Sequence, residues 1–168
     1  GGLNTSSKTL TIDGASNTYI TGPITGSSGG RIQTTGNGTL TLSGTNSAPY
    51  TLKVVAGNVV VTNPDALSTV GTSSILDSGA SASDTGTLIL TGGLSNSNAY
   101  RVGTITPGGN LTISTVGGDS TLTIDGASGS GQSGTVEKKL NINAGVNVII
   151  SGSFDLIGRS EEHTSELR

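Results

Sequence analysis

The sequence predicts an all-β protein, a right-handed parallel β-helix (β-solenoid) built from short strands and glycine-rich turns. Three observations support this prediction: apolar and polar residues alternate in short runs, glycine-containing pairs separate the runs, and longer stretches recur along the chain. A β-sandwich is the alternative. A sandwich core normally contains more aromatic residues than the single phenylalanine, Phe154, and the three tyrosines of this chain.

The strands are predicted from runs that place apolar side chains at every second position, the pattern of a strand with one buried face. These runs contain Leu10/Ile12, Leu40/Leu42, Leu52/Val54, Val59/Val61, Leu88/Leu90, Leu111/Ile113, Leu122/Ile124, Leu140/Ile142 and Val146/Val148/Ile150. Between them lie turn pairs, in which glycine can adopt a positive φ without steric cost. The pairs are Asp13-Gly14, Asn37-Gly38, Ser43-Gly44, Gly92-Gly93, Gly108-Gly109, Gly117-Gly118 and Asp125-Gly126. No helix is predicted, because the best candidate, Pro64 to Leu67, is one turn at most.

Internal repetition is visible at two scales. The run Gly38 to Gly44 returns 48 residues later as Gly86 to Gly92, and Asn46 to Tyr50 is echoed by Asn96 to Tyr100. The heptad Leu10 to Ser16 recurs identically as Leu122 to Ser128. These spacings suggest one repeating unit with an insertion. Such a unit cannot bury its own apolar face, so we expect it to stack on its neighbours.

Composition excludes several function classes. Charged residues make up 11% of the chain, the formal net charge is −3 and the basic residues are scattered, which argues against binding to nucleic acid or anionic lipid. The longest apolar run, Val146 to Ile150, is far shorter than the roughly 20 residues of a membrane-spanning helix, so we expect no membrane insertion of this segment. Without cysteine there is no disulfide, thiolate metal site or cysteine nucleophile.

The order of these motifs resembles the autotransporter-associated β-strand repeat family. The resemblance covers residues 20–67 well and residues 85–100 moderately. The matching parts are a lead-in at Ile20 to Gly30, a core at Gly38 to Asn46, a second strand at Val55 to Val61 and a connector at Asn63 to Leu67. Arg31-Ile32 and Pro49-Tyr50 depart from the family pattern, which leaves the strand register uncertain. The resemblance implies an extracellular passenger region on a bacterial cell surface, with an outer-membrane barrel or anchoring signal further downstream.

Composition changes abruptly near the C-terminus. Residues 159–168 contain the single histidine, three glutamates and no glycine. Arg159 to Leu167 also resembles the translation of a sequencing-adapter oligonucleotide. We therefore expect residues 1–158 to be a β-solenoid repeat region, part of a longer protein, and residues 159–168 to be a non-native tail. An acidic, solvated natural tail is the alternative.

Candidate catalytic groups in the repeat region are dispersed carboxylates: Asp13, Asp65, Asp77, Asp84, Asp119, Asp125, Glu137 and Asp155. Asp13 and Asp125 precede glycine in the repeated heptad, which favours a turn role over a sugar-cleaving pair. Gly117-Gly118-Asp119 occurs without the tandem calcium-binding signature, and the Gly-Gly pairs lack the context of a phosphate loop. We therefore expect no catalytic, cofactor-binding or metal-ligating residues, and no cofactor.

Tyrosine and lysine side chains offer two weaker alternatives. Tyr19, Tyr50 and Tyr100 could present rings to sugars or proteins, but tyrosines at the core edge that cover turns are the preferred interpretation. Lys138-Lys139 is interpreted as a solvated strand face.

These observations together predict a non-catalytic, surface-displayed scaffold with a role in adhesion or surface structure. Its partners would be neighbouring repeats of the same chain and a surface ligand, either protein or glycan. The alternatives are a β-helix polysaccharide-degrading enzyme, a phage tail-spike fragment, and an artefact of sequence assembly that does not adopt one fold.

We expect the isolated chain to self-associate, because the ends of a solenoid expose unpaired strand edges and neither terminus resembles a polar cap. Light scattering at high protein concentration should detect oligomers. A monodisperse monomer would contradict this prediction.

Overall fold

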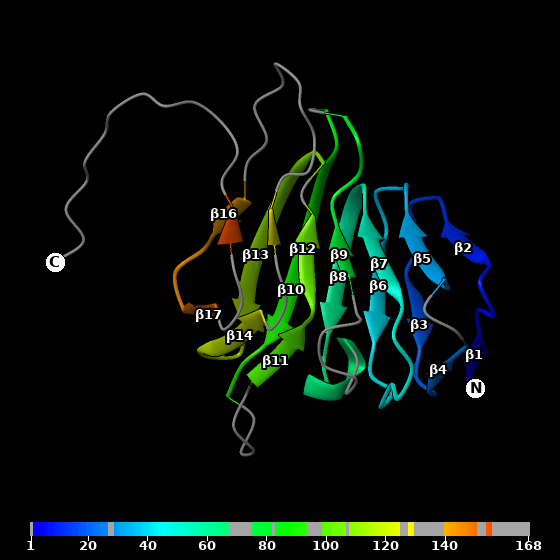
Figure 1. Ribbon diagram of the computed structural model, residues 1–168, viewed down its shortest axis with the longest axis horizontal. Helices are drawn as coiled ribbons and strands as arrows, with labels where there is room; N and C mark the ends of the chain where they lie inside the picture. The colour runs from blue at the N-terminus through cyan, green and yellow to red at the C-terminus, as the bar shows by residue number, and fades with distance from the viewer. Residues whose placement is uncertain are drawn as a thin grey trace, which may run out of the picture.

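The computed structural model describes residues 2–26, 29–67, 75–81, 83–93, 99–106, 108–124, 128–129, 140–150 and 154–155. Its strands lie side by side along the long axis, with the N-terminal and C-terminal strands at opposite ends (Figure 1). Every described strand pair is parallel. The chain forms a β-solenoid of about five turns, which confirms the predicted fold class in place of a β-sandwich.

Two long sheets form two sides of the solenoid. The five-stranded sheet contains β2 (Thr9–Ile12), β5 (Arg31–Thr34), β7 (Thr51–Val54), β9 (Ile75–Asp77) and β12 (Thr104–Thr106). The six-stranded sheet contains β3 (Thr18–Ile20), β6 (Thr39–Leu42), β8 (Ala56–Val61), β10 (Thr85–Thr91), β13 (Asn110–Val116) and β16 (Leu140–Ile142). In each turn the chain passes from the first sheet to the second.

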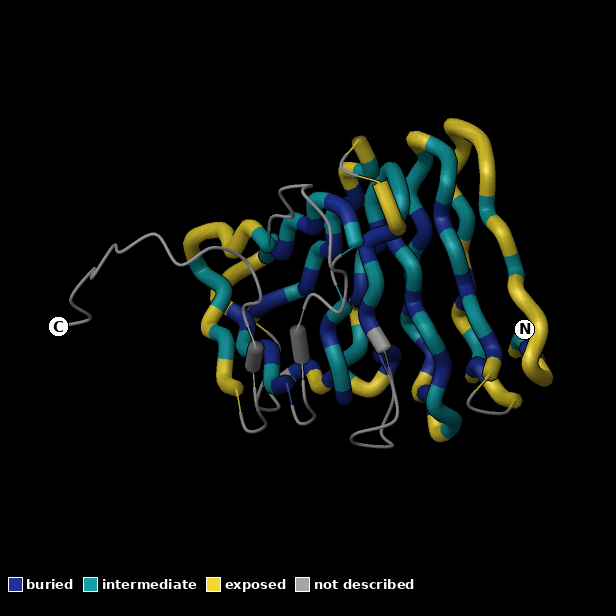
Figure 2. The backbone as a smooth tube through the Cα atoms, turned by 45° about the horizontal axis from the view of Figure 1, so that its top comes forward, coloured by how far each residue is buried: buried dark blue, intermediate teal, exposed yellow. Residues whose placement is uncertain are grey.

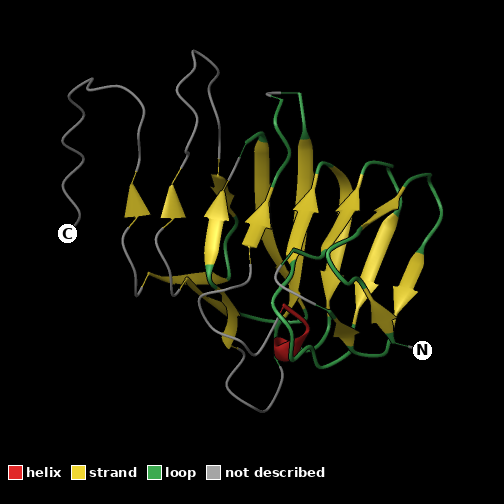
Figure 3. Ribbon diagram, turned by 45° about the vertical axis from the view of Figure 1, so that its right-hand side comes forward, coloured by secondary structure: helices red, strands yellow, loops and turns green. Residues whose placement is uncertain are grey.

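The third side is interrupted midway. It begins with the pair β1 (Leu3–Asn4) and β4 (Ile24–Thr25), and it resumes with β11 (Ala99–Val102), β14 (Ser120–Ile124) and β17 (Val146–Ile150). Between these groups lies a single 3-10 turn, η1 (Pro64–Leu67), drawn in red in Figure 3. One further pair, β15 (Ser128–Gly129) and β18 (Phe154–Asp155), lies next to β12.

The core is a set of aliphatic columns that run along the solenoid axis. In the six-stranded sheet Leu40, Val59, Leu88 and Ile113 are in register on consecutive strands, and all four are buried. Buried residues line the interior of the tube, and exposed residues gather at the turns (Figure 2). At about 1.5–3 kcal/mol for each buried aliphatic side chain, these columns are the main favourable term in folding.

All nine alternating runs of the sequence lie in strands, which confirms the period-two prediction: they form β2, β6, β7, β8, β10, β13, β14, β16 and β17. The prediction that Pro64 to Leu67 forms at most one helical turn is also confirmed, because these four residues form the 3-10 turn η1. At the C-terminal end, Ile142 and Ile150 are 41% and 47% exposed although they align with buried Ile113 and Ile124.

The 48-residue repeat spans two turns of the solenoid. The chain takes 19 residues from Leu40 to its register partner Val59, and 29 residues from Val59 to Leu88. The repeated heptad also changes side: its first copy lies in β2 of the five-stranded sheet, and Leu122 of its second copy lies in β14 of the third side.

Glycine at the corners meets two different requirements. Gly14 has the positive φ that the turn prediction assumed, at 113°. Gly44 has no positive φ; a Cβ there would collide with the backbone of Gly22 in the preceding turn of the solenoid. The close approach of consecutive turns therefore selects glycine at Gly44. The predicted turn at Asp125-Gly126 lies outside the described residues.

Buried Asn46 fills the gap in the third side. Its Oδ1 accepts a hydrogen bond from the Ile24 N–H at 2.6 Å, its own N–H donates to the Asp65 carbonyl at 3.0 Å, and its Nδ2 donates to the Ala66 carbonyl. The Tyr50 hydroxyl also donates to the Ala66 carbonyl, at 2.7 Å. One side chain thus joins η1 to β4, on the edge of β4 that lies opposite its strand partner β1.

Replacing Asn46 with alanine should lower the free energy of unfolding by about 2–4 kcal/mol, because the buried Ile24 N–H loses its acceptor. Urea unfolding followed by circular dichroism measures the change. Asn58→Ala is the matched control, since Asn58 points outward from β8, and it should change stability by less than about 0.5 kcal/mol. Equal losses in the two variants would contradict the bridging role of Asn46.

Candidate functional site

Asp77 and Asp84 lie in one turn of the solenoid, and Asp13, Asp65 and Asp119 lie in other turns. The carboxylates of Asp13, Asp77 and Asp84 accept hydrogen bonds from nearby backbone N–H groups. The Asp13 Oδ1 accepts a hydrogen bond from the Gly14 N–H at 2.9 Å, which confirms the turn role predicted from the heptad. Asp119 is exposed and follows Gly117 and Gly118, which both have positive φ. Asp125, Glu137 and the side chain of Asp155 lie outside the described part of the chain.

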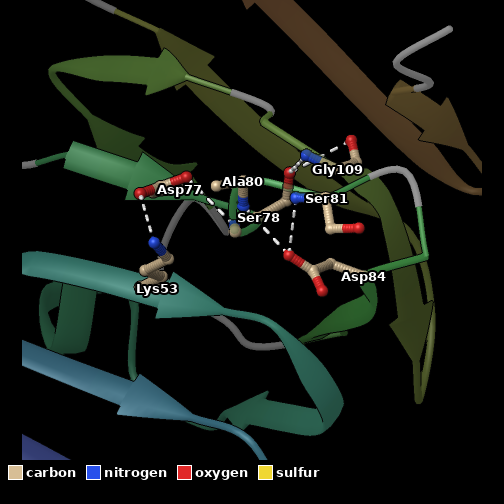
Figure 4. Close-up of polar contacts among 8 residues, drawn as sticks. Lys53, Asp77, Ser78, Ala80, Ser81, Asp84 and Gly109 are labelled. Carbon is tan, nitrogen blue, oxygen red and sulfur yellow. Dashed lines mark hydrogen bonds and ion pairs between the residues drawn. The ribbon is translucent and has the colours of Figure 1, made fainter. Parts of the chain in front are cut away.

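A cluster of polar side chains lies where the chain leaves β9 for β10, and we term it the polar corner: Lys53, Asp77, Ser78, Asp84 and Gly109. Lys53 and Asp77 are register partners on adjacent strands, with Lys53 Nζ 3.7 Å from Asp77 Oδ2 (Figure 4). The other carboxylate oxygen of Asp77 accepts the Gly79 N–H at 3.1 Å. Such a partly exposed ion pair contributes at most about 1 kcal/mol to stability.

The rest of the polar corner ties the loop to the next turn of the solenoid. Asp84 Oδ2 accepts hydrogen bonds from the N–H groups of Ala80 and Ser81, each at 2.9 Å (Figure 4). The fully buried Ser78 hydroxyl donates to the Gly109 carbonyl at 3.2 Å and accepts the Gly109 N–H at 3.1 Å.

The side chains of the polar corner hold the loop between β9 and β10 in place by hydrogen bonds to its backbone and to the next turn of the solenoid. Both of its carboxylates are engaged by backbone N–H groups, and Asp77 by Lys53 as well. Within the described ranges no group of three or more His, Cys, Asp or Glu side chains lies close enough together to hold a metal ion. The arrangement therefore explains how an irregular loop is held at a corner.

The tyrosines divide into two kinds. Tyr50 and Tyr100 are buried, which confirms their core position; the Tyr100 hydroxyl donates to the Thr91 carbonyl at 2.7 Å and accepts the Thr91 N–H at 3.0 Å. Burial raises the pKa of both hydroxyls above the usual value for tyrosine. Tyr19 is 65% exposed on β3, so the expectation of a core-edge position was wrong for this residue.

The outer face of the six-stranded sheet is a second candidate surface, and sequence reasoning did not single it out. Tyr19, Thr41, Val60, Ile89 and Ser114 form one column in register, and Thr39, Asn58, Thr87, Thr112 and Asn141 form the next. These residues alternate with the buried columns and therefore point outward. The sequence indicates this face through the polar residues that alternate with the apolar ones in each run.

Two regions discussed from the sequence cannot be compared with the structure. Lys138-Lys139 and the tail at residues 159–168 lie outside the described residues. Across the described ranges, no helix is long and apolar enough to span a membrane.

Comparison of the chain with protein-family models, with curated proteins and with solved structures found no match in any of the three.

The two buried tyrosines predict a loss of stability at alkaline pH. The unfolded chain releases their protons near pH 10, whereas the folded chain retains them, so stability present below about pH 10 is lost as the pH rises further. Each tyrosine should lower the free energy of unfolding by up to about 1.4 kcal/mol per pH unit. Urea titrations on both sides of pH ~10 measure this slope.

Tyr50→Phe should reduce the alkaline slope, because the variant lacks one of the two buried hydroxyls. Equal slopes in Tyr50→Phe and the unmodified chain would contradict the assignment.

Proposed function

We propose that this chain is a non-catalytic β-solenoid scaffold from an exported bacterial surface protein of the autotransporter type, with a role in adhesion or surface structure. The observation that carries the proposal is the pair of long parallel sheets with their aliphatic columns. In such a repeat architecture each turn contacts its neighbours and presents extended side faces.

The positions of the polar groups support a scaffold without catalysis. A hydrolase of the β-helix type needs two carboxylates facing each other across a bound sugar. In the described residues Asp13, Asp77 and Asp84 instead accept hydrogen bonds from nearby backbone N–H groups. These groups maintain the turns and corners on which the side faces depend.

Export and surface display are supported by the sequence. The resemblance of residues 20–67 to the autotransporter-associated β-strand repeat implies a passenger region outside the cell. The scattered basic residues offer no strong attraction to nucleic acid or anionic lipid. The partners in this proposal are neighbouring repeats of the same chain and a protein or glycan ligand at the surface.

Antibodies against the chain, applied to intact cells of the source bacterium, test this proposal. The expected result is labelling of unbroken cells that is removed by external protease, while a cytoplasmic control protein remains protected. Labelling only after cell lysis would contradict surface display. Release of reducing sugars by the purified chain, abolished in Asp77→Asn, would contradict the absence of catalysis.

A further inference from the structure

The outer face of the six-stranded sheet differs from the rest of the surface because its two central columns contain no charged residue. The columns are Tyr19, Thr41, Val60, Ile89 and Ser114, and beside them Thr39, Asn58, Thr87, Thr112 and Asn141. The five-stranded sheet, by contrast, presents Arg31, Lys53 and Asp77 outward. The solenoid thus has one charged and one neutral long face.

Several polar groups on this neutral face are available to a ligand. In the part of the chain that the structure describes, the side chains of Thr39, Thr41, Asn58 and Thr87 make no hydrogen bond, nor does the Tyr19 hydroxyl. Hydroxyl and amide groups both donate and accept hydrogen bonds. The face therefore offers free donors and acceptors without a net charge.

These groups recur with the period of the solenoid. Adjacent parallel strands lie about 4.8 Å apart, so each column repeats a side chain at this interval along the axis. A polymer lying along the column from Thr39 to Asn141 would meet a polar group at every strand, and in the column beside it Val60 and Ile89 separate Thr41 from Ser114. At the N-terminal end of one column the 65% exposed ring of Tyr19 offers an apolar face with a polar tip.

The chemistry of the face restricts the partner. Nucleic acid and acidic polysaccharide bind through clustered basic residues, and the two columns have none. A stable protein interface has an apolar, aromatic-rich centre, but here Val60 and Ile89 are flanked by Thr41 and Ser114. A neutral sugar chain matches the face, since its hydroxyls pair with threonine and asparagine and its C–H faces stack on tyrosine.

We propose that the outer face of the six-stranded sheet binds a linear, uncharged polysaccharide along the solenoid axis, with Tyr19 as the stacking anchor. This inference rests on the proposed surface function and names its ligand class. Binding should be insensitive to salt, because no ion pairs form between the face and an uncharged chain.

Sedimentation of the purified full chain with insoluble cellulose and with chitin, at low and high salt, tests the proposal. Binding to at least one of the two is expected, together with a loss of roughly tenfold in affinity for Tyr19→Ala. The double variant Thr41→Val/Thr87→Val removes two hydroxyls from the neutral face. Its matched control, Thr51→Val/Thr104→Val, removes two hydroxyls from the outer face of the five-stranded sheet and should bind like the unmodified chain.

Several outcomes would overturn the proposal: no binding to either glycan, equal losses in the two double variants, or binding that is abolished by salt. Preferential binding to polygalacturonate, to DNA or to a protein on the same face would also overturn it. If the chain binds neither glycan but antibodies still label intact cells, only the proposed ligand class is refuted. Labelling only after lysis would refute the surface function itself.

Discussion

Consecutive turns of this chain must lie about 4.8 Å apart, because parallel strands form hydrogen bonds at that separation. The spacing brings backbone against backbone at some corners, as at Gly44, where a Cβ would collide with the Gly22 carbonyl. It also places like side chains directly above one another, so aliphatic residues form continuous columns. Where the strand ladder fails on the third side, Asn46 supplies the missing hydrogen bonds from its side chain.

The narrow interior determines which aromatic residues the core accepts. Tyr50 and Tyr100 are buried, and each needs a partner for its hydroxyl group. Tyr50 bonds to the Ala66 carbonyl of η1, and Tyr100 bonds to Thr91. Both rings therefore lie near the interruption of the third side, where backbone groups are not engaged by a neighbouring strand. The interruption of the third side leaves carbonyl groups free to accept hydrogen bonds, and the buried tyrosine hydroxyls donate to them.

Alternation and glycine spacing were sufficient to predict the solenoid and its long strands, because both follow directly from the stacking constraint. Short strands were missed because most of them place only one aliphatic residue inward, as with Ile24 in β4, Leu76 in β9 and Ile105 in β12, and one residue shows no alternation. In β5 the buried Thr34 satisfies its hydroxyl by donating to the Ala56 carbonyl at 3.0 Å, which hides the apolar pattern. The polar corner could not be predicted, since Lys53 and Asp77 are distant in sequence and meet only when consecutive turns stack. The exposure of Tyr19 depends on strand register, which the sequence left open.

The change of side by the repeated heptad has a consequence for how such a chain can evolve. Leu10 and Leu122 both point into the core, one from the five-stranded sheet and one from the third side. The three sides thus make the same demand on a strand, an apolar residue at every second position. A duplicated or recombined gene segment can then be inserted out of phase with the turns and still fold. Selection on such a protein would act on total length, on surface chemistry and on the few contacts that require a particular neighbour, such as that of Gly44 with Gly22.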